Sequence, residues 1–311
     1  MIPLGRVPRV MEGELGAFSA AHPLAVSAGV AALLDRGSVA DAAVAAQAVL
    51  CVVMPEACGL SGDLIARVGE SSGRVTAMNA TGRSARATPS GESVSDGGAS
   101  VTVRGLVDCW GQLSSQWGRL PLTTTFARAR SLARLGCRIL ASTADASSAQ
   151  RLRFIRRGAA DCPIAMVPHG QHLVQSELAN LLDGIGARKA RWFYEGDPAA
   201  AVVRAVQRNG GFLELADLAA HDTPILDFAA GTFQWSASRG SAAAGRWRSQ
   251  DGAVLIEAGH PSTRSLARRG HEVIQYRSGD AVFGAVVAPG VSVGVPYAGS
   301  DWRRQVWSAV T

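Results

Sequence analysis

The chain of 311 residues is 47% hydrophobic and 18% charged, a balance typical of a globular protein with one large or two small domains. Its formal net charge is +6 at pH 7, carried almost entirely by arginine, with Lys189 as the single lysine. The densest basic stretch, Arg151–Arg157, is typical of a solvated helix face. The sequence has no zinc-finger spacing, aromatic RNA-binding signature or glycine-rich phosphate loop, so we expect no nucleic-acid partner.

Cysteine usage and the N-terminal sequence both bear on the compartment. The five cysteines lie inside apolar stretches rather than in a metal-binding array, which predicts reduced core residues. They are Cys51, Cys58, Cys109, Cys137 and Cys162. Acids and prolines stand near the N-terminus where a secretory signal has its apolar run, and no window is apolar enough to span a bilayer. We therefore expect a cytoplasmic protein with no membrane partner.

The first half of the chain predicts packed helices and one hairpin. Apolar residues at helical spacing, many of them alanine, predict two closely packed helices. Alternation on either side of the turn Ser71–Gly73 predicts a β-hairpin. In chain order these elements are helices over 25–34 and 40–50, strands over 63–68 and 74–79, and helices over 106–117 and 124–135.

The second half predicts further helices and then strands. Helical patterns cover 176–185, 199–209 and 215–220. A stretch rich in Ser, Ala, Gly and Arg follows, which predicts a linker over residues 236–252. After it we expect a strand over 253–256, a helix over 262–269 and strands over 272–276 and 281–287.

An ordered series of motifs runs along most of the chain. The series comprises Ala20–Gly29, Asp41–Ala46, Val52–Glu56, Trp117–Pro121, Phe193–Gly196, Gly210–Ala220, Ile256–Pro261 and Ala298–Arg304. In order and spacing it resembles the gamma-glutamyltransferases. Residues 20–235 resemble the large subunit of that family and residues 253–311 the end of its small subunit. We expect a single domain over residues 1–311.

The resemblance implies an α/β fold, the αββα sandwich of N-terminal-nucleophile hydrolases, here truncated. Self-cleavage in that family frees a threonine whose own amine acts as the base. In this chain the stretch Asp227–Phe233, which resembles the end of the large subunit, runs within about two dozen residues into the tail. The segment with the cleavage site and the nucleophile is therefore expected to be missing. Thr232 and Ser61 favour structural roles in a strand and a turn.

Four residues are candidates for a ligand site. Arg83, with Ser84 after it, matches the family segment whose arginine holds the substrate α-carboxylate; its alternative is a surface arginine. Asp108 is the candidate catalytic acid/base group, because it is a carboxylate in an apolar helix start, although an acid there also suits the helix dipole. Trp110 is the candidate aromatic contact, with core packing as its alternative. The six histidines show no metal-ligand spacing, so we expect no metal and no cofactor.

These residues leave two functional hypotheses open. The first is a non-autoprocessing enzyme of specialised metabolism that binds an amino acid by its carboxylate and performs acid/base condensation, with a Pictet–Spengler-like ring closure as the model reaction. The second is a non-catalytic protein that binds a metabolite or a partner. Because a missing core segment leaves sheet edges and apolar surface, we expect a homodimer under either hypothesis.

Overall fold

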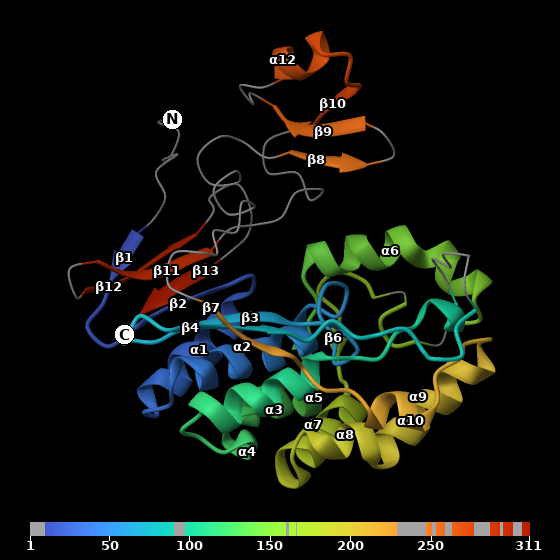
Figure 1. Cartoon of the computed structure of the whole chain (residues 1–311), viewed down its shortest axis with the longest axis horizontal. Coiled ribbons are helices and arrows are strands. Elements are labelled where there is room, and N and C mark those ends of the chain that lie inside the picture. The colour runs from blue at the N-terminus through green and yellow to red at the C-terminus, as the bar shows by residue number, and fades with distance from the viewer. Residues whose placement is uncertain are drawn as a thin grey trace. The chain divides into compact units, whose positions relative to one another are not determined.

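The computed structural model describes residues 10–89, 97–159, 162–165, 167–228, 247–250, 253–258, 263–276, 287–292, 295–300 and 307–311. Contacts divide the chain into two units, one of Ala31–Ala230 and the other of Met1–Val30 with Gly231–Thr311. The boundary falls inside the first helix, α1 (Pro23–Leu34) (Figure 1). No helix in the described part of the chain is both long and apolar enough to cross a membrane.

Helices make up most of the larger unit. They are α2 (Val39–Val53), the 3₁₀ turn η1 (Gly98–Ser100), α3 (Leu106–Trp117), α4 (Leu122–Thr125), α5 (Ala127–Leu135), α6 (Ala141–Arg156), α7 (Ser176–Arg188), α8 (Arg191–Glu195), α9 (Asp197–Arg208) and α10 (Leu215–Ala219). Every helix predicted for this unit is present, and α3 has the predicted bounds. The basic stretch that the sequence predicts as a helix face forms the end of α6.

Helix α2 is the buried centre of the larger unit. Most of its residues are buried, which fits its alanine-rich sequence. Ser38 and Asp41 form a capping box at its N-terminus, which satisfies the backbone N–H groups of both residues. Oδ2 of Asp41 also accepts hydrogen bonds from the backbone N–H groups of Arg119, at 2.8 Å, and Leu120. Asp41 thus ties the connection between α3 and α4 to the start of α2.

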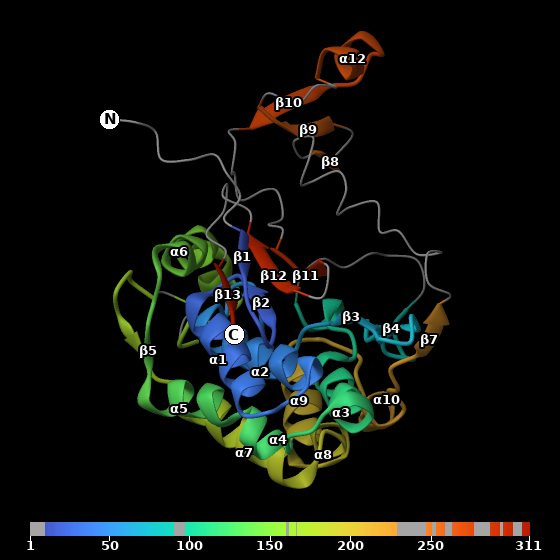
Figure 2. The ribbon, with the colours of Figure 1, turned by 90° about the vertical axis from the view of Figure 1, so that its left-hand side faces the viewer.

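One antiparallel sheet of the larger unit has the order β3 (Ile65–Gly69), β4 (Val75–Asn79) and β7 (Ile225–Phe228). Strands β3 and β4 form the predicted hairpin, and α3 lies next to them (Figures 1 and 2). In the pairing of β4 with β7, Met78 is opposite Ile225. This pairing joins segments that are about 150 residues apart in the sequence. Two short strands, β5 (Cys137–Arg138) and β6 (His172–Leu173), also pair.

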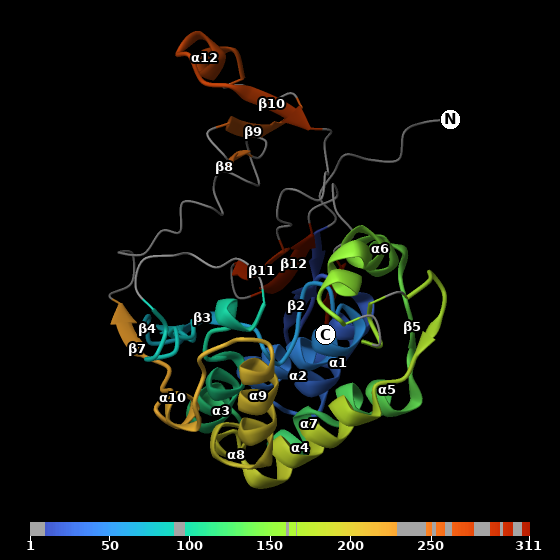
Figure 3. The same cartoon turned by 90° about the vertical axis from the view of Figure 1, so that its right-hand side faces the viewer.

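The smaller unit is built from strands. They are β1 (Val10–Glu12), β2 (Ala17–Ala20), β8 (Trp247–Gln250), β9 (Ala253–Glu257), β10 (Val273–Tyr276), β11 (Val287–Ser292), β12 (Val295–Ser300) and β13 (Trp307–Val310). They pair in the orders β1-β12-β11, β10-β9-β8 and β13-β2. Helix α12 (Thr263–Arg268) connects β9 to β10, which run parallel (Figure 3).

The tail matches its predicted elements where the structure describes it. Strand β9, helix α12 and strand β10 confirm the expected strand, helix and strand. Strand β8 lies within residues 236–252, where the sequence predicts a linker; the rest of that stretch lies outside the described residues. Thr232 and most of the strand predicted over 281–287 also lie outside them.

Candidate functional site

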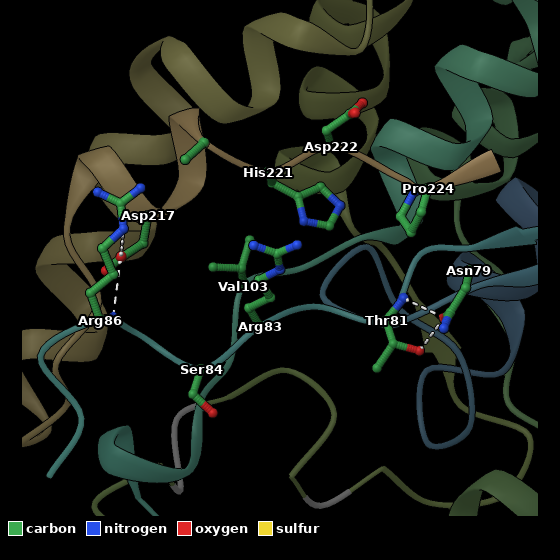
Figure 4. A pocket seen from close by; sticks show the side chains of 11 residues that line it. Asn79, Thr81, Arg83, Ser84, Arg86, Val103, Asp217, His221, Asp222 and Pro224 are labelled. Carbon is green, nitrogen blue, oxygen red and sulfur yellow. Dashed lines mark hydrogen bonds and ion pairs between the residues drawn. The ribbon is translucent and has the colours of Figure 1, made fainter. Parts of the chain in front are cut away.

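A cavity of about 440 Å³ opens in the larger unit beside the end of β4. Two stretches form most of its wall, the segment that follows β4 and the segment from α10 to β7 (Figure 4). The lining residues are Asn79, Thr81, Arg83, Ser84, Arg86, Val103, Asp217, Ala220, His221, Asp222 and Pro224. A cavity of this size and polarity suits a small polar molecule.

Pairing of β4 with β7 brings the two walls together. The pairing continues past the strand ends, because the N–H of Asn79 donates to the carbonyl of Pro224 at 3.2 Å. From there the chain after β4 forms one wall and the chain before β7 forms the other. Backbone hydrogen bonds thus hold the two walls together at the strand ends, and the Asp217 carboxylate joins them again by accepting a hydrogen bond from the N–H of Arg86 at 3.3 Å.

Two glycines let the chain after β4 lie directly against the chain before α3. A Cβ atom at Gly82 would lie 1.4 Å from the carbonyl oxygen of Val103, and one at Gly105 would lie 1.8 Å from that of Ala80. The N–H of Val103 donates to the carbonyl of Arg83 at 2.9 Å. Because neither position has room for a side chain, glycine is required at both.

Arg83 and Ser84, the predicted substrate-binding residues, lie in the wall of the cavity. Both are exposed and line the cavity, and the Arg83 guanidinium extends toward His221 (Figure 4). Among the described residues, no carboxylate pairs with Arg83. The neighbouring Arg86 differs, since its Nε lies 3.8 Å from Oδ1 of the buried Asp217. Arg83 therefore presents to the cavity a guanidinium that has no ion-pair partner among the described residues.

His221 is the residue of the site that sequence reasoning did not single out. Its side chain is buried, and its ring stacks on Tyr194 with centroids 5.4 Å apart and planes 14° apart. Its Nε2 has no hydrogen-bond partner in the described part of the chain. Burial lowers the pKa of His221, and the guanidinium groups of Arg191 and Arg83 lower it further, against the opposing effect of the Asp108 and Asp222 carboxylates.

Asp108, the predicted acid/base group, is buried behind the cavity wall and does not line it. Its Oδ2 accepts hydrogen bonds from the backbone N–H of Thr223 at 2.9 Å and from Nε2 of Gln112 at 3.0 Å. Its own N–H donates to the Tyr194 hydroxyl, which in turn donates to the carbonyl of Arg104. Asp108 thus holds the segment that carries His221 against α3 and α8.

Trp110, the predicted aromatic contact, is fully buried and does not line the cavity. Its ring packs against Phe126 with centroids 5.3 Å apart, and its Nε1 donates to Oε1 of Gln47 at 3.1 Å. The structure therefore brings Arg83 and Ser84 together in the cavity and places Asp108 and Trp110 in the protein interior. Among the described residues, no cluster of three or more His, Cys, Asp or Glu side chains is arranged to hold a metal ion.

Comparison with known proteins identifies the family to which the chain is similar. A family model described as gamma-glutamyltranspeptidase matches residues 25–234. The glutathione hydrolase-like YwrD proenzyme of Bacillus subtilis is 34% identical over 222 residues, which cover 64% of this chain and 40% of that protein. The chain thus spans about two fifths of that relative's length.

Two solved structures agree with the fold. The cephalosporin acylase of Bacillus halodurans has a TM-score of 0.84 at 15% identity, covering 100% of this chain and 98% of that one. The gamma-glutamyltranspeptidase of Helicobacter pylori has a TM-score of 0.65 at 23% identity, covering 81% and 72%. Both likenesses confirm the predicted α/β fold class. Because the family model matches about two thirds of the chain, this protein belongs to the gamma-glutamyltranspeptidase family.

Proposed function

We propose that the cavity binds an amino acid by its α-carboxylate, which Arg83 holds with two parallel hydrogen bonds. The observation that carries this proposal is the exposed Arg83 guanidinium, which has no carboxylate partner among the described residues and faces a cavity of about 440 Å³. A planar guanidinium matches a carboxylate in geometry and charge. Ser84, on the same wall, adds a hydroxyl group beside that anchor.

The reaction that we propose is acid/base condensation rather than γ-glutamyl transfer. Its model is a Pictet–Spengler-like closure, in which the amine of the bound amino acid adds to a carbonyl compound and water leaves. A ring carbon then attacks the resulting iminium carbon and loses its proton to a base. The sequence argues against γ-glutamyl transfer, because its large-subunit-like part passes into the tail without the threonine segment that is expected for acyl transfer.

The groups around the cavity are compatible with that chemistry. Histidine is the side-chain type that carries protons near neutral pH, and His221 lines the cavity, although burial lowers its pKa below 6.5. Asp108, which the sequence suggested for this task, acts on the cavity through the Thr223 backbone that it holds. We therefore propose Asp108 as a positioning residue in this reaction.

Binding is tested by isothermal titration with a panel of amino acids, each paired with its decarboxylated amine. We expect at least one amino acid to bind and its amine to bind far more weakly. Arg83→Ala is expected to weaken binding about 30-fold, roughly 2 kcal/mol for a charge-assisted pair. Arg128→Ala, on the exposed face of α5, is the matched control and should bind normally. Equal binding of amine and amino acid would refute the carboxylate anchor.

Turnover is tested separately by mass spectrometry. Incubation of the protein with an amino acid that binds and a set of aldehydes should give a product whose mass is the sum of the two reactants minus water. The rate must exceed that of the uncatalysed reaction and fall in Arg83→Ala. Tight binding without any such product would favour the non-catalytic, metabolite-binding hypothesis instead.

A further inference from the structure

Four charged side chains act on His221, namely the carboxylates of Asp108 and Asp222 and the guanidinium groups of Arg191 and Arg83. Asp108, on α3, is already an acceptor for Thr223 and Gln112. Asp222, next in the chain, accepts a hydrogen bond from Gln112 at 3.3 Å. Arg191, on α8, pairs with Glu195, and its Nε and NH2 groups lie 2.9 and 2.8 Å from Oε1.

Two further groups near the ring are Tyr194 and Arg83. The Tyr194 ring covers one face of the imidazole, and its hydroxyl is hydrogen-bonded to the backbone of Arg104 and Asp108. The Arg83 guanidinium extends toward the imidazole across the cavity (Figure 4). Arg83 is thus a guanidinium near His221 that has no ion-pair partner among the described residues.

We propose that His221 is a second carboxylate-binding residue of this site and that it takes up a proton when a carboxylate ligand binds beside Arg83. This inference rests on the proposed function, because it needs the ligand carboxylate at Arg83. In the unliganded cavity a protonated ring would face the Arg83 charge while buried, which is unfavourable. A bound carboxylate balances Arg83 and offers an acceptor to a ring N–H, so the protonated ring becomes favourable.

The direction of the pH effect follows from proton linkage. Burial lowers the pKa of His221 in the unliganded site below its ordinary value of 6.5; the Asp108 and Asp222 carboxylates oppose this shift, and Arg191 and Arg83 add to it. The ligand carboxylate raises it in the complex. Between those two pKa values the complex holds more protons than the free protein, so affinity increases as the pH falls. Below the lower value and above the higher value, affinity should not depend on pH.

The experiment is isothermal titration of the full chain with L-tryptophan, L-phenylalanine and L-glutamate as probes, between about pH 5 and pH 8. Two buffers with different ionisation enthalpies give the number of protons taken up at each pH. We expect uptake that approaches one proton near the centre of this range, and a Kd that increases by up to about tenfold per pH unit there.

Two histidine variants make the result specific. His221→Gln keeps hydrogen-bonding groups but cannot titrate, so its Kd should be independent of pH and its proton uptake close to zero. His169→Gln replaces an exposed histidine that does not line the cavity, and it should retain the behaviour of the unaltered protein. If His221→Gln does not fold, proton uptake by the unaltered protein still decides the question.

The outcomes separate this inference from the function on which it rests. Binding that depends on Arg83 but takes up no proton would overturn the role of His221 and leave the carboxylate anchor in place. Proton uptake that persists in His221→Gln would also overturn it. If none of the three probes binds at any pH, the carboxylate site fails for these ligands and the role of His221 fails with it.

Discussion

Replacing Asp108 with alanine removes the acceptor that holds the backbone of Thr223 against α3. Thr223 is only 2% exposed, so its N–H would be left without a partner, at a cost of about 1–3 kcal/mol. Gln112 loses less, since its Nε2 also donates to Asp222 and to the carbonyl of Thr223. Adding the lost charge-assisted bond, we expect Asp108→Ala to reduce the free energy of unfolding by about 2–4 kcal/mol.

Urea unfolding followed by circular dichroism measures this loss, and two variants bracket it. Asp108→Asn keeps one carbonyl oxygen for the Thr223 N–H and should lose only about 1 kcal/mol. Gln116→Ala, on the exposed side of the same helix, should change stability by less than about 0.5 kcal/mol. If Asp108→Ala is no more destabilised than Gln116→Ala, the proposed hold of Asp108 on this segment is refuted.

Four further outcomes are expected. Gly105→Ala should prevent stable folding, as judged by circular dichroism, because the added Cβ would lie 1.8 Å from the Ala80 carbonyl oxygen. Trp110→Ala should reduce the free energy of unfolding by about 3–5 kcal/mol in urea titrations, the cost of removing a large buried ring. Burial lowers the pKa of His22 and His221 below 6.5, so the unfolded chain binds more protons than the folded protein near pH 6. Melting temperatures should therefore fall as the pH is lowered from about 7.5 to 5.5. The fall should be smaller in the variant with glutamine at both positions. The chain should run as one uncleaved band near 32.2 kDa and release no chromophore from a γ-glutamyl anilide; two fragments or clear turnover would contradict the loss of the nucleophile.

Local sequence patterns predicted the elements that are long enough to show their own apolar spacing or that are joined by a short turn. Helix α2 and the β3–β4 hairpin are of this kind, since apolar spacing and a short turn suffice to identify them. Helix α8 was missed because its five residues are too few to show a helical period. It begins two residues after Lys189, whose backbone is left-handed with a φ of 67°. Strand β8 was missed because its neighbours in sequence have the composition of a linker.

Of the candidate site, the sequence predicted only the residues that belong to a recognisable motif. Arg83 was found by its resemblance to a family segment, which fixes a residue but not its surroundings. His221 lies across the cavity because β4 pairs with β7, and no local pattern reveals such a long-range pairing. Trp110 shows the opposite limit, because an aromatic residue that packs in the core cannot be told by sequence from one that lines a cavity.

The two glycines under the cavity also determine how this site can diversify. A side chain at Gly82 or Gly105 would force apart the segment after β4, which carries Arg83, and the segment before α3. A library that varies these two positions should therefore consist mainly of proteins that do not fold. Thr81 and Ser84 are exposed and line the same cavity, so they can change without moving the backbone. Ligand preference can therefore evolve, or be redesigned, by changes at exposed positions such as Thr81 and Ser84, while the backbone contact at Gly82 and Gly105 stays the same.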